Sequence, residues 1–502
     1  MNNSFDFSSF SKQSPKGIFV IYIAFIYEVL KATWLLLFIV FKDFSEISSF
    51  NVNYIYFGFA FILLFLLMRA ILIYKNFQFK IKDEHFILKQ GILKKTNTAI
   101  PFHRIQNINF KQNLIQQIIN VHEVSIETAG TSKTEISIKA ISLEKAKALK
   151  EMITTNKAFN ASLAKEKETE IKPLLSIGIK ELFKVCLTEN HLRNLFLFLA
   201  VIIGFYQQVQ QLTDSLGKTE ILDGFIKENT NAVTASVFLI FLLLIIIIVV
   251  ALLTSFVKVF LVHFNLKVFL KKNAFEINQG LITKKSIVLK KQKVQNITIS
   301  TNPLKRLIGI SFVNFKQAVS GKLNNKKKEK LIRIVGCKKD QIETIKNSLF
   351  NVDYVENREK NFADNYYKRR IFLFTFLFLI VVYSALYLTF SKVEIFYSII
   401  LVIPIVVFLI FKKVNKRFYK ISDAMLLVGK GLIETHITYL EIFKVQNIKM
   451  KQTVFQKRSN VADIIFQTAS GKIKIPCIPF SDAINIYNHT LYKVETSTKE
   501  WM

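Results

Sequence analysis

One segment of the chain occurs three times, and this repetition limits the folds that the sequence can adopt. Residues 91–108 read GILKKTNTAIPFHRIQNI, residues 280–297 read GLITKKSIVLKKQKVQNI, and residues 431–448 read GLIETHITYLEIFKVQNI. A pair of long apolar stretches precedes each copy. The chain is therefore expected to contain three equivalent units rather than one large domain.

Six apolar stretches predict helices that cross a membrane, which takes about 20 mostly apolar residues. They come in pairs, and one polar segment follows each pair. The third stretch is the weakest because it ends in QQVQQ, but a single crossing there would place successive repeats on opposite sides of the membrane. The predicted spans are Ile18–Phe41, Tyr54–Tyr74, Leu195–Leu212, Val233–Val257, Ile371–Phe390 and Val393–Phe411.

The distribution of basic residues predicts the orientation in the membrane. The chain is 51% hydrophobic, yet it carries 69 Lys and Arg against 36 Asp and Glu, a net charge of +33. The connections inside the pairs hold almost none of this charge: residues 43–53 contain no Lys or Arg, and the other two contain only Lys218, Lys227 and Lys392. Because basic flanking segments stay on the cytoplasmic side, both termini and all three polar segments are expected in the cytoplasm.

Each copy of the repeat predicts two strands joined by a turn. Apolar residues alternate with polar ones before Gly91, Gly280 and Gly431, which is typical of strands that end in a turn. Further on, the alternation slips by one residue at a Gln–Asn pair, as a β-bulge would produce. Two interpretations of the pair stay open, a structural role in shaping the sheet and a role in lining a ligand-binding rim. The pairs are Gln106 and Asn107, Gln295 and Asn296, and Gln446 and Asn447.

A resemblance to a known family rests on these residues. Each polar segment ends in a helical pattern, starting at Ser142, Lys338 and Ser481. The strand pattern, the Gln–Asn–Ile core and the turn Thr128-Ala129-Gly130 resemble the bacterial pleckstrin-homology-like (PH-like) domain, type 2. The pairing with helical hairpins resembles the YdbT-like membrane proteins. The second copy departs from the pattern at the turn, where it reads QAVSG, and the third reads TASG and lacks the proline found at Pro101.

The resemblance implies a membrane protein with α-helical transmembrane hairpins plus three all-β PH-like barrels of seven strands, each closed by a C-terminal helix. It also implies the bacterial cytoplasmic (inner) membrane as the location. The expected hairpins lie within residues 1–76, 193–264 and 370–413, and the PH-like domains at 77–156, 265–351 and 414–497. Residues 157–192 are expected to form a linker and an interfacial helix, and residues 352–369 a second linker.

Neither catalysis nor metal binding is predicted. The sequence lacks a nucleophile elbow, a zinc-binding HExxH motif, a phosphate-binding loop and a dinucleotide fingerprint. The seven histidines share no ligand spacing, and Cys186, Cys337 and Cys477 suit neither a disulfide framework nor a zinc site. No catalytic residue, metal or cofactor is therefore expected.

Basic residues are the candidates for binding anionic lipid or a partner. Lysines next to an anionic leaflet contribute roughly 1 kcal/mol each, and the alternative is that they are only a solvated surface. Nucleic acid is not expected as a partner, because aromatic residues do not interleave with the basic clusters. The candidate residues are Lys290, Lys291, Lys293, Lys326, Lys327, Lys328, Arg104 and Lys444.

An amphipathic segment and a pair of charged residues lie next to or within the predicted spans. Residues 173–186 have apolar residues at helical spacing and are expected to form a helix on the membrane surface. Glu28 and Lys31 interrupt the first span at a spacing that suits a local ion pair. A functional charge at membrane depth is the alternative for them.

The expected function is that of a non-catalytic membrane scaffold that presents three cytoplasmic PH-like modules to proteins or anionic lipids. The protein partners are unknown, and a neighbouring PH-like membrane protein is one candidate. Family resemblance adds envelope maintenance or resistance to antimicrobial peptides as the process. A transporter or channel component is an alternative, disfavoured because the repeats are parallel and the spans hold few polar residues. A lipid-acting membrane enzyme is a second alternative, disfavoured by the lack of an acid–base constellation.

Overall fold

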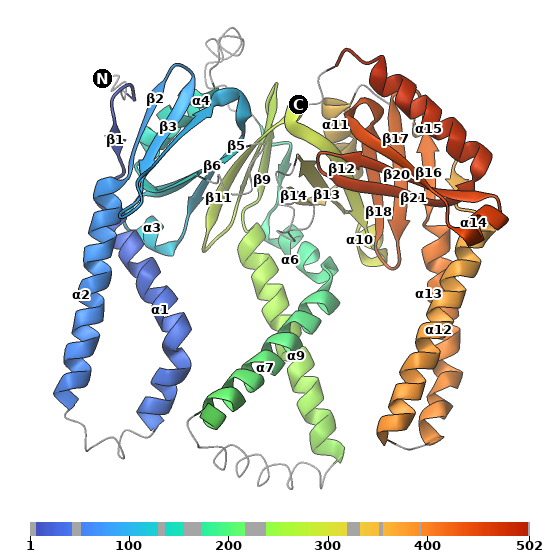
Figure 1. Ribbon diagram of the computed structural model, residues 1–502, viewed down its shortest axis with the longest axis horizontal. Helices are drawn as coiled ribbons and strands as arrows, with labels where there is room; N and C mark the ends of the chain where they lie inside the picture. Colours follow the sequence, from blue (N-terminus) through green and yellow to red (C-terminus); the bar gives the residue numbers. More distant parts are fainter. Residues whose placement is uncertain are drawn as a thin grey trace.

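Three pairs of long helices extend from one side of an assembly of β-sheets (Figure 1). The pairs are α1 (Gly17–Lys42) with α2 (Val52–Asn76), α7 (His191–Ser215) with α9 (Val237–His263), and α12 (Asn365–Phe390) with α13 (Ile399–Asn415). The computed structural model describes residues 7–42, 52–128, 136–154, 172–215, 237–318, 332–350, 355–390 and 393–499.

Four of these helices contain stretches that are long and apolar enough to cross a membrane, counted over the described residues. They are Tyr56–Asn76, Ile245–His263, Asn365–Leu388 and Phe396–Asn415. The first and third predicted spans form α1 and α7, which pack against α2 and α9 but are not among the four. In α7 the apolar part is confined to Leu195–Phe205. Large apolar side chains on α12, such as Phe374 and Leu388, are mostly exposed, which suits a surface covered by lipid.

Each helical pair is followed by a module of six strands and a C-terminal helix, with a short helix between the fourth and fifth strands, in the same order three times. Module 1 consists of β2 (Gln78–Lys82), β3 (His85–Gln90), β4 (Thr96–Pro101), β5 (Ile105–Gln112), β6 (His122–Thr128), β7 (Ile136–Ile141) and α4 (Leu143–Thr154). Module 2 consists of β9 (Lys267–Leu270), β10 (Ala274–Gln279), β11 (Lys284–Lys290), β12 (Val294–Thr301), β13 (Ser311–Gln317), β14 (Ile332–Cys337) and α11 (Lys339–Leu349). Module 3 consists of β16 (Phe418–Ile421), β17 (Met425–Gly431), β18 (Thr435–Glu441), β19 (Val445–Lys451), β20 (Val461–Thr468), β21 (Gly471–Pro479) and α15 (Phe480–Glu495).

A short seventh strand of each module comes from the chain in front of its helical pair. These strands are β1 (Ser11–Lys12), β8 (Leu175–Ser176) and β15 (Asn361–Phe362), and they pair with β2, β9 and β16. The two segments expected to be linkers therefore each contribute a strand, and α12 already begins at Asn365. Both ends of every hairpin are thus fixed to the same sheet.

The helix expected over residues 173–186 is shorter than predicted. The chain forms β8 first, and α6 then runs over Ile179–Thr188. Leu182, Val185 and Cys186 are buried in the core of module 2, so this face packs on protein rather than on lipid. The opposite face, with Ile179, Phe183 and Leu187, is exposed.

The strands of a module do not close into a barrel in the described residues, contrary to the expectation. A turn of 3-10 helix between the third and fourth strands, as at Phe102–Arg104 in module 1, separates each module into two sheets. The second sheet of one module then continues into the first sheet of the next. The resulting strand orders are β7-β6-β5-β11-β10-β9-β8 and β14-β13-β12-β18-β17-β16-β15, with β1-β2-β3-β4 and β19-β20-β21 at the two ends. We call this assembly of sheets the platform.

The turns and bulges predicted from the repeat are confirmed. Gly280 has φ of +107°, and a Cβ there would lie 2.1 Å from the carbonyl oxygen of Thr283, so only glycine fits the turn. Gly91 and Gly431 have the same geometry. The register of the fourth strand shifts between Ile105 and Asn107, and at the equivalent points of β12 and β19. A β-bulge therefore lies at the Gln of each Gln–Asn pair.

Candidate functional site: the junctions between modules

The modules are joined by strand ladders that cross the module boundaries. At the first junction β5 pairs antiparallel with β11, from Asn107 opposite Leu289 to Gln112 opposite Lys284. At the second junction β12 pairs with β18, from Asn296 opposite Leu440 to Thr301 opposite Thr435. The repeats align Leu289 with Leu440 and Asn107 with Asn296, so the two junctions have the same register. Each ladder satisfies the backbone groups of two strands that would otherwise be exposed edges.

The asparagine of the Gln–Asn pair lies in these junctions. Asn107 donates a hydrogen bond to Oε1 of Gln317 in module 2, and Nε2 of Gln317 donates back to Asn107 Oδ1 over 3.0 Å. Asn296 donates from Nδ2 to Oγ of Ser470 in module 3, 2.6 Å away. Asn107 and Asn296 are 2% and 1% exposed. The side-chain amides of both residues therefore join neighbouring modules, which favours the structural interpretation of the pair.

The third copy of the pair has no such neighbour within the described residues. Gln446 and Asn447 are exposed, whereas Gln295 at the equivalent position in module 2 is buried. The side chain of Gln106 lies outside the described part of the structure. The same sequence motif is thus buried at the two junctions between described modules and exposed in module 3.

A second contact at each junction joins a short helix to the glycine turn of the next module. In the first, Gln117 in α3 (Leu114–Ile118) donates from Nε2 to the carbonyl of Ile282 over 2.9 Å. In the second, Lys305 in α10 (Pro303–Ile308) lies 2.6 Å from Oε1 of Glu434. The ammonium group of Lys305 also sits 3.6 Å from the ring centre of Phe312, and its side chain is 2% exposed. A fully buried lysine is tolerated here because its charge is paired.

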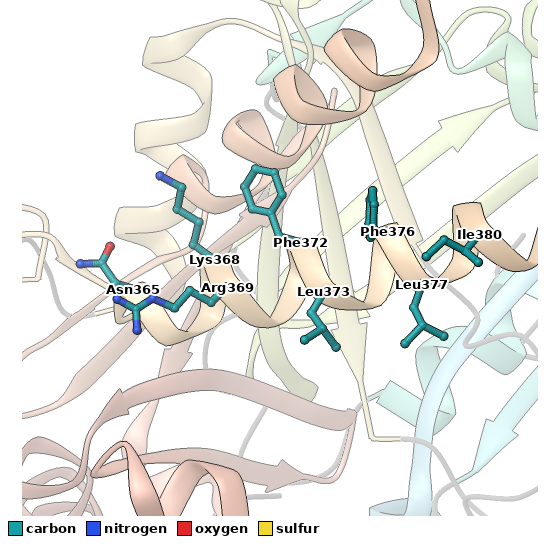
Figure 2. A pocket seen from close by; sticks show the side chains of 8 residues that line it. All are labelled: Asn365, Lys368, Arg369, Phe372, Leu373, Phe376, Leu377 and Ile380. Carbon is teal, nitrogen blue, oxygen red and sulfur yellow. The ribbon is translucent and has the colours of Figure 1, made fainter. Parts of the chain in front are cut away.

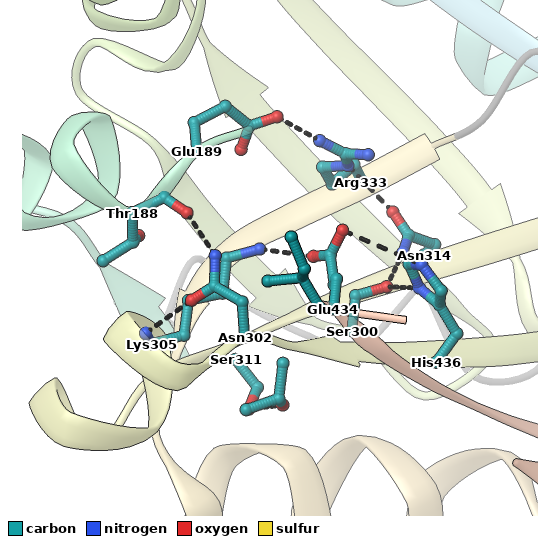
Figure 3. Close-up of polar contacts among 12 residues, drawn as sticks. Thr188, Glu189, Ser300, Asn302, Lys305, Ser311, Asn314, Arg333, Glu434 and His436 are labelled. Carbon is teal, nitrogen blue, oxygen red and sulfur yellow. Dashed lines mark hydrogen bonds and ion pairs between the residues drawn. The ribbon is translucent and has the colours of Figure 1, made fainter. Parts of the chain in front are cut away.

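Further polar contacts surround this ion pair and connect α6 with modules 2 and 3 (Figure 3). Glu434 Oε2 lies 3.7 Å from His436 Nε2, and His436 Nδ1 lies 2.8 Å from Oγ of Ser300. Asn314 donates to the same Ser300 oxygen over 3.0 Å. Arg333 donates to Oδ1 of Asn314 over 2.9 Å and to Oε1 of Glu189, after α6, over 2.9 Å. We call these six residues, together with Lys305, the junction network.

The electrostatics of the junction network favour a structural role. Burial, with Lys430, Lys305 and Arg333 nearby, lowers the pKa of His436 and so favours its neutral form. Burial tends to raise the pKa of Glu434, but hydrogen bonding and attraction from Lys305 outweigh this and lower it. Two cations, Lys305 and Arg333, are matched by two carboxylates, Glu434 and Glu189. The network therefore joins the modules through paired charges rather than offering a free acid or base.

The basic candidates occupy different environments. Lys291 lies next to Asn273 in the β9–β10 turn, because its backbone N–H donates to the Asn273 carbonyl. The other end of β11 starts at the turn that contacts the end of α9, where the Leu281 N–H donates to the Leu261 carbonyl. A strand of this length spans about 20 Å. Lys290, Lys291 and Lys293 therefore lie on the side of the platform that is remote from the helices.

The remaining basic candidates divide between a junction and the free surface. Lys444 is 7% exposed, donates to the Val294 carbonyl over 2.8 Å and pairs with Glu441 over 2.7 Å. It is thus part of the second junction. Arg104, at the equivalent position in module 1, is exposed. Lys326, Lys327 and Lys328 lie outside the described residues.

The side of the platform next to the helices carries apolar turns. Leu281 and Ile282 follow Gly280 and are each 40% exposed, and Leu93 in the turn of module 1 is fully exposed. Lys416, just after α13, donates to the carbonyls of Leu432 and Ile433 in the turn of module 3, over 2.8 Å and 2.6 Å. Exposed apolar side chains at the ends of membrane helices suit the interface between headgroups and acyl chains.

A groove of about 710 Å³ follows α12 (Figure 2). Its lining is polar near the module, with Asn365, Lys368 and Arg369, and apolar further along the helix, with Phe372, Phe376 and Ile380 among its residues. The ammonium group of Lys368 lies 4.2 Å from the ring centre of Phe411 in α13. A basic end and an apolar length suit one acyl chain with an anionic headgroup.

No group of three or more His, Cys, Asp or Glu residues that could hold a metal ion occurs in the described ranges. The three cysteines are free and buried. Burial raises the pKa of Cys186 to about 11 and that of Cys337 to about 12, which keeps both as unreactive thiols.

The chain matches the family model described as Bacterial PH domain over residues 23–157, 219–352 and 372–494, which is more than half of its length. It is also similar to the UPF0699 transmembrane protein YdbT of Bacillus subtilis (strain 168), with 25% identity over 270 residues. That alignment covers 51% of this chain and 53% of the relative, so the chain spans about half the length of the curated relative it matches. Each matched range ends at the helix that completes a module. The chain therefore belongs to the bacterial PH domain family, with three copies of the domain.

Proposed function

We propose that the chain is a non-catalytic scaffold of the bacterial cytoplasmic membrane, whose platform lies on the cytoplasmic side and binds proteins. The strand ladders between modules carry this proposal. Three flexibly tethered domains would present three independent surfaces, whereas continuous sheets hold binding surfaces on different modules at fixed distances. Such an arrangement favours the assembly of several partners, because their relative orientation is set in advance.

The distribution of charge supports the proposed orientation. The connections inside the helical pairs are almost free of Lys and Arg, and the modules carry the excess of basic residues. Positively charged segments are retained in the cytoplasm during insertion. The single side from which all three pairs extend agrees with a platform that is parallel to the membrane (Figure 1).

Anionic lipid is part of the proposal, at the face next to the helices. The exposed Leu93 and Ile282 would insert at headgroup depth, and Lys368 and Arg369 would pair with lipid phosphates at the end of the α12 groove. We assign Lys290, Lys291 and Lys293 to the opposite, protein-binding face. A role in envelope maintenance or in resistance to antimicrobial peptides is compatible with such a platform.

The competing functions receive less support. A transporter needs a path between helices, but the three helical pairs stand apart in Figure 1 and each connects to its own module. A lipid-acting enzyme needs a free acid or base, and the charged groups of the junction network are paired.

Photo-crosslinking in native membranes tests the proposal. A photoreactive amino acid would replace Lys272 or Asp423, exposed residues in the β9–β10 and β16–β17 turns of the remote face, and, as a matched control, Leu373 in the α12 groove. We expect the two turn positions to capture the same protein and position 373 to capture lipid. Protein capture at neither turn, together with solute flux through the purified chain in liposomes, would contradict the scaffold and favour a transporter.

A further inference from the structure

The two ends of the platform expose strand edges of complementary kinds. β5 and β12 each receive a strand from the next module, and β19 is the equivalent strand of module 3. β11 and β18 each supply that strand, and β4 is the equivalent strand of module 1. Within the described residues, β19 and β4 are the outermost strands of their sheets. The chain thus carries one acceptor edge and one donor edge of the same junction.

Exposure shows that these edges differ from the internal ones by the absence of a neighbour. Asn447 is exposed, while Asn107 and Asn296 at the same position are 2% and 1% exposed. In β4, Ala99 is exposed, while Tyr439 at the same position in β18 is 7% exposed. Long exposed edges are a template for pairing with another chain.

We propose that β19 of one chain pairs antiparallel with β4 of a second copy, so that copies join head to tail within the membrane. The register of the internal junctions places Asn447 opposite Ile100, Lys449 opposite Thr98 and Lys451 opposite Thr96. No like charges then stand directly opposite, although the first internal junction tolerates Lys111 opposite Lys285. The inference rests on the proposed scaffold only in that both platforms must lie on the same side of the membrane.

Two further positions fit this contact. Lys444 reaches across the second junction to the Val294 carbonyl, and Arg104 at the same position in module 1 would reach the Val445 carbonyl of the other copy. Gln117 reaches across the first junction to the glycine turn of module 2. The exposed Lys457 at the same position in α14 (Val454–Arg458) would reach the turn of the other copy, where Leu93 is fully exposed.

The geometry keeps every copy in one membrane. Both internal junctions leave the helical pairs on the same side of the sheets (Figure 1), and a third junction of the same kind repeats that relation. The contact is heterologous, because it joins different edges of the two copies. It therefore generates rows, or rings if the rotation between copies closes.

Disulfide crosslinking of the whole 502-residue chain in isolated membranes tests the proposal. Chains with Lys449→Cys and chains with Thr98→Cys, differently tagged, are coexpressed and oxidised; a second set uses Met450→Cys with Asn97→Cys. Because adjacent pairs of an antiparallel ladder alternate in spacing, one of the two sets suits a disulfide. We expect a mixed dimer from at least one set. Lys449→Cys with Asn97→Cys is the control, and its yield should be about tenfold lower because a one-residue slip points the side chains to opposite faces.

Three results would overturn the proposal. The first is the formation of dimers by Lys449→Cys chains alone, which would indicate that β19 of one copy pairs with β19 of another. The second is the capture of a different PH-domain protein by Lys449→Cys without capture of a second copy, which would show that this other protein pairs with β19. The third is a lack of any crosslink although one of two internal pairs, Asn109→Cys with Ile287→Cys or Phe110→Cys with Ser286→Cys, closes across the β5–β11 ladder. A protease site within residues 160–165 would reveal that internal disulfide. If both internal pairs also fail, the platform itself is wrong, which separates the two proposals.

Discussion

Gln317 in β13 donates a hydrogen bond from Nε2 to Oδ1 of Asn107 in β5, 3.0 Å away and 210 residues earlier in the sequence. The two side chains belong to different modules, and Asn107 donates to Gln317 in return. This pair shows how a repeated motif joins domains: the bulge at Gln106 turns the following asparagine toward the next module, whose own strand then covers it.

Replacement of Asn107 by alanine should destabilise the first junction. The substitution leaves the buried amide of Gln317 without its partner, which costs roughly 1–3 kcal/mol. Thermal unfolding of the purified chain should show a lowered Tm. Asn447→Ala changes the equivalent but exposed residue and should shift stability by no more than about 0.5 kcal/mol. Equal effects of the two substitutions would show that the asparagine acts within its own module.

The Lys305–Glu434 pair should respond unequally to removal of its two partners. Glu434→Gln leaves a buried ammonium group without a counter-charge and should cost about 3 kcal/mol. Lys305→Met should cost less, because Glu434 is 23% exposed and can be hydrated. Chemical denaturation of both variants measures the difference. Glu276→Gln, which breaks the more exposed pair with Lys271, is the control and should cost at most about 1 kcal/mol. A milder effect of Glu434→Gln than of Lys305→Met would argue against this assignment of burial.

Acidification should weaken the second junction through His436. Its pKa is lowered in the folded chain, so the unfolded chain binds a proton more readily between that lowered value and about 6.5. The resulting stability is fully present above pH 6.5 and is lost as the pH falls through the pKa of the folded state. Unfolding of the wild-type chain measured between pH 7.5 and 5.5 should show this loss, and His436→Gln should reduce the slope. An unchanged slope in the variant would assign the pH dependence to other histidines.

Cysteine labelling should reveal the orientation of the chain. The native cysteines provide a low background, because all three are buried and burial raises the pKa of Cys477 to about 11, as it raises those of Cys186 and Cys337. Ser48→Cys and Leu222→Cys, between paired helices, should react with an impermeant maleimide on intact cells, or on spheroplasts if an outer membrane is present. Asp423→Cys on the platform should react only after lysis. Labelling of position 423 before lysis would reverse the proposed topology.

Local features of the fold follow from the sequence because they depend on neighbouring residues. Gly91, Gly280 and Gly431 mark turns that require a positive φ, and the phase slip at each Gln–Asn pair marks a bulge. The apolar stretches likewise mark the helices of the three pairs. The two-residue strands such as β8 are too short for any alternation to appear, which is why residues 173–178 resemble the start of a helix.

The junctions could not be predicted, because strand periodicity shows which face of a strand is buried but not which strand lies beside it. The same alternation of buried and exposed residues would result if each module closed into a barrel or if its sheets extended into the next module. Lys305 and Lys444 have the sequence appearance of surface lysines, and their burial depends on partners in another module. The sequence does indicate that Lys305 lies in a short helix, since Asn302 and Pro303 mark the start of that helix.

Hydrogen exchange of single chains in nanodiscs tests the continuous platform most directly, because β4, β11 and β18 are the same strand in three modules. In the continuous platform β11 and β18 each pair with a strand on both sides, whereas β4 pairs only with β3. All amides of β11 and β18 should therefore exchange slowly, while about half of those in β4, the outward-facing ones, exchange quickly. If β11 and β18 instead showed the half-protected pattern of β4, the modules would be separate domains and the platform would not exist.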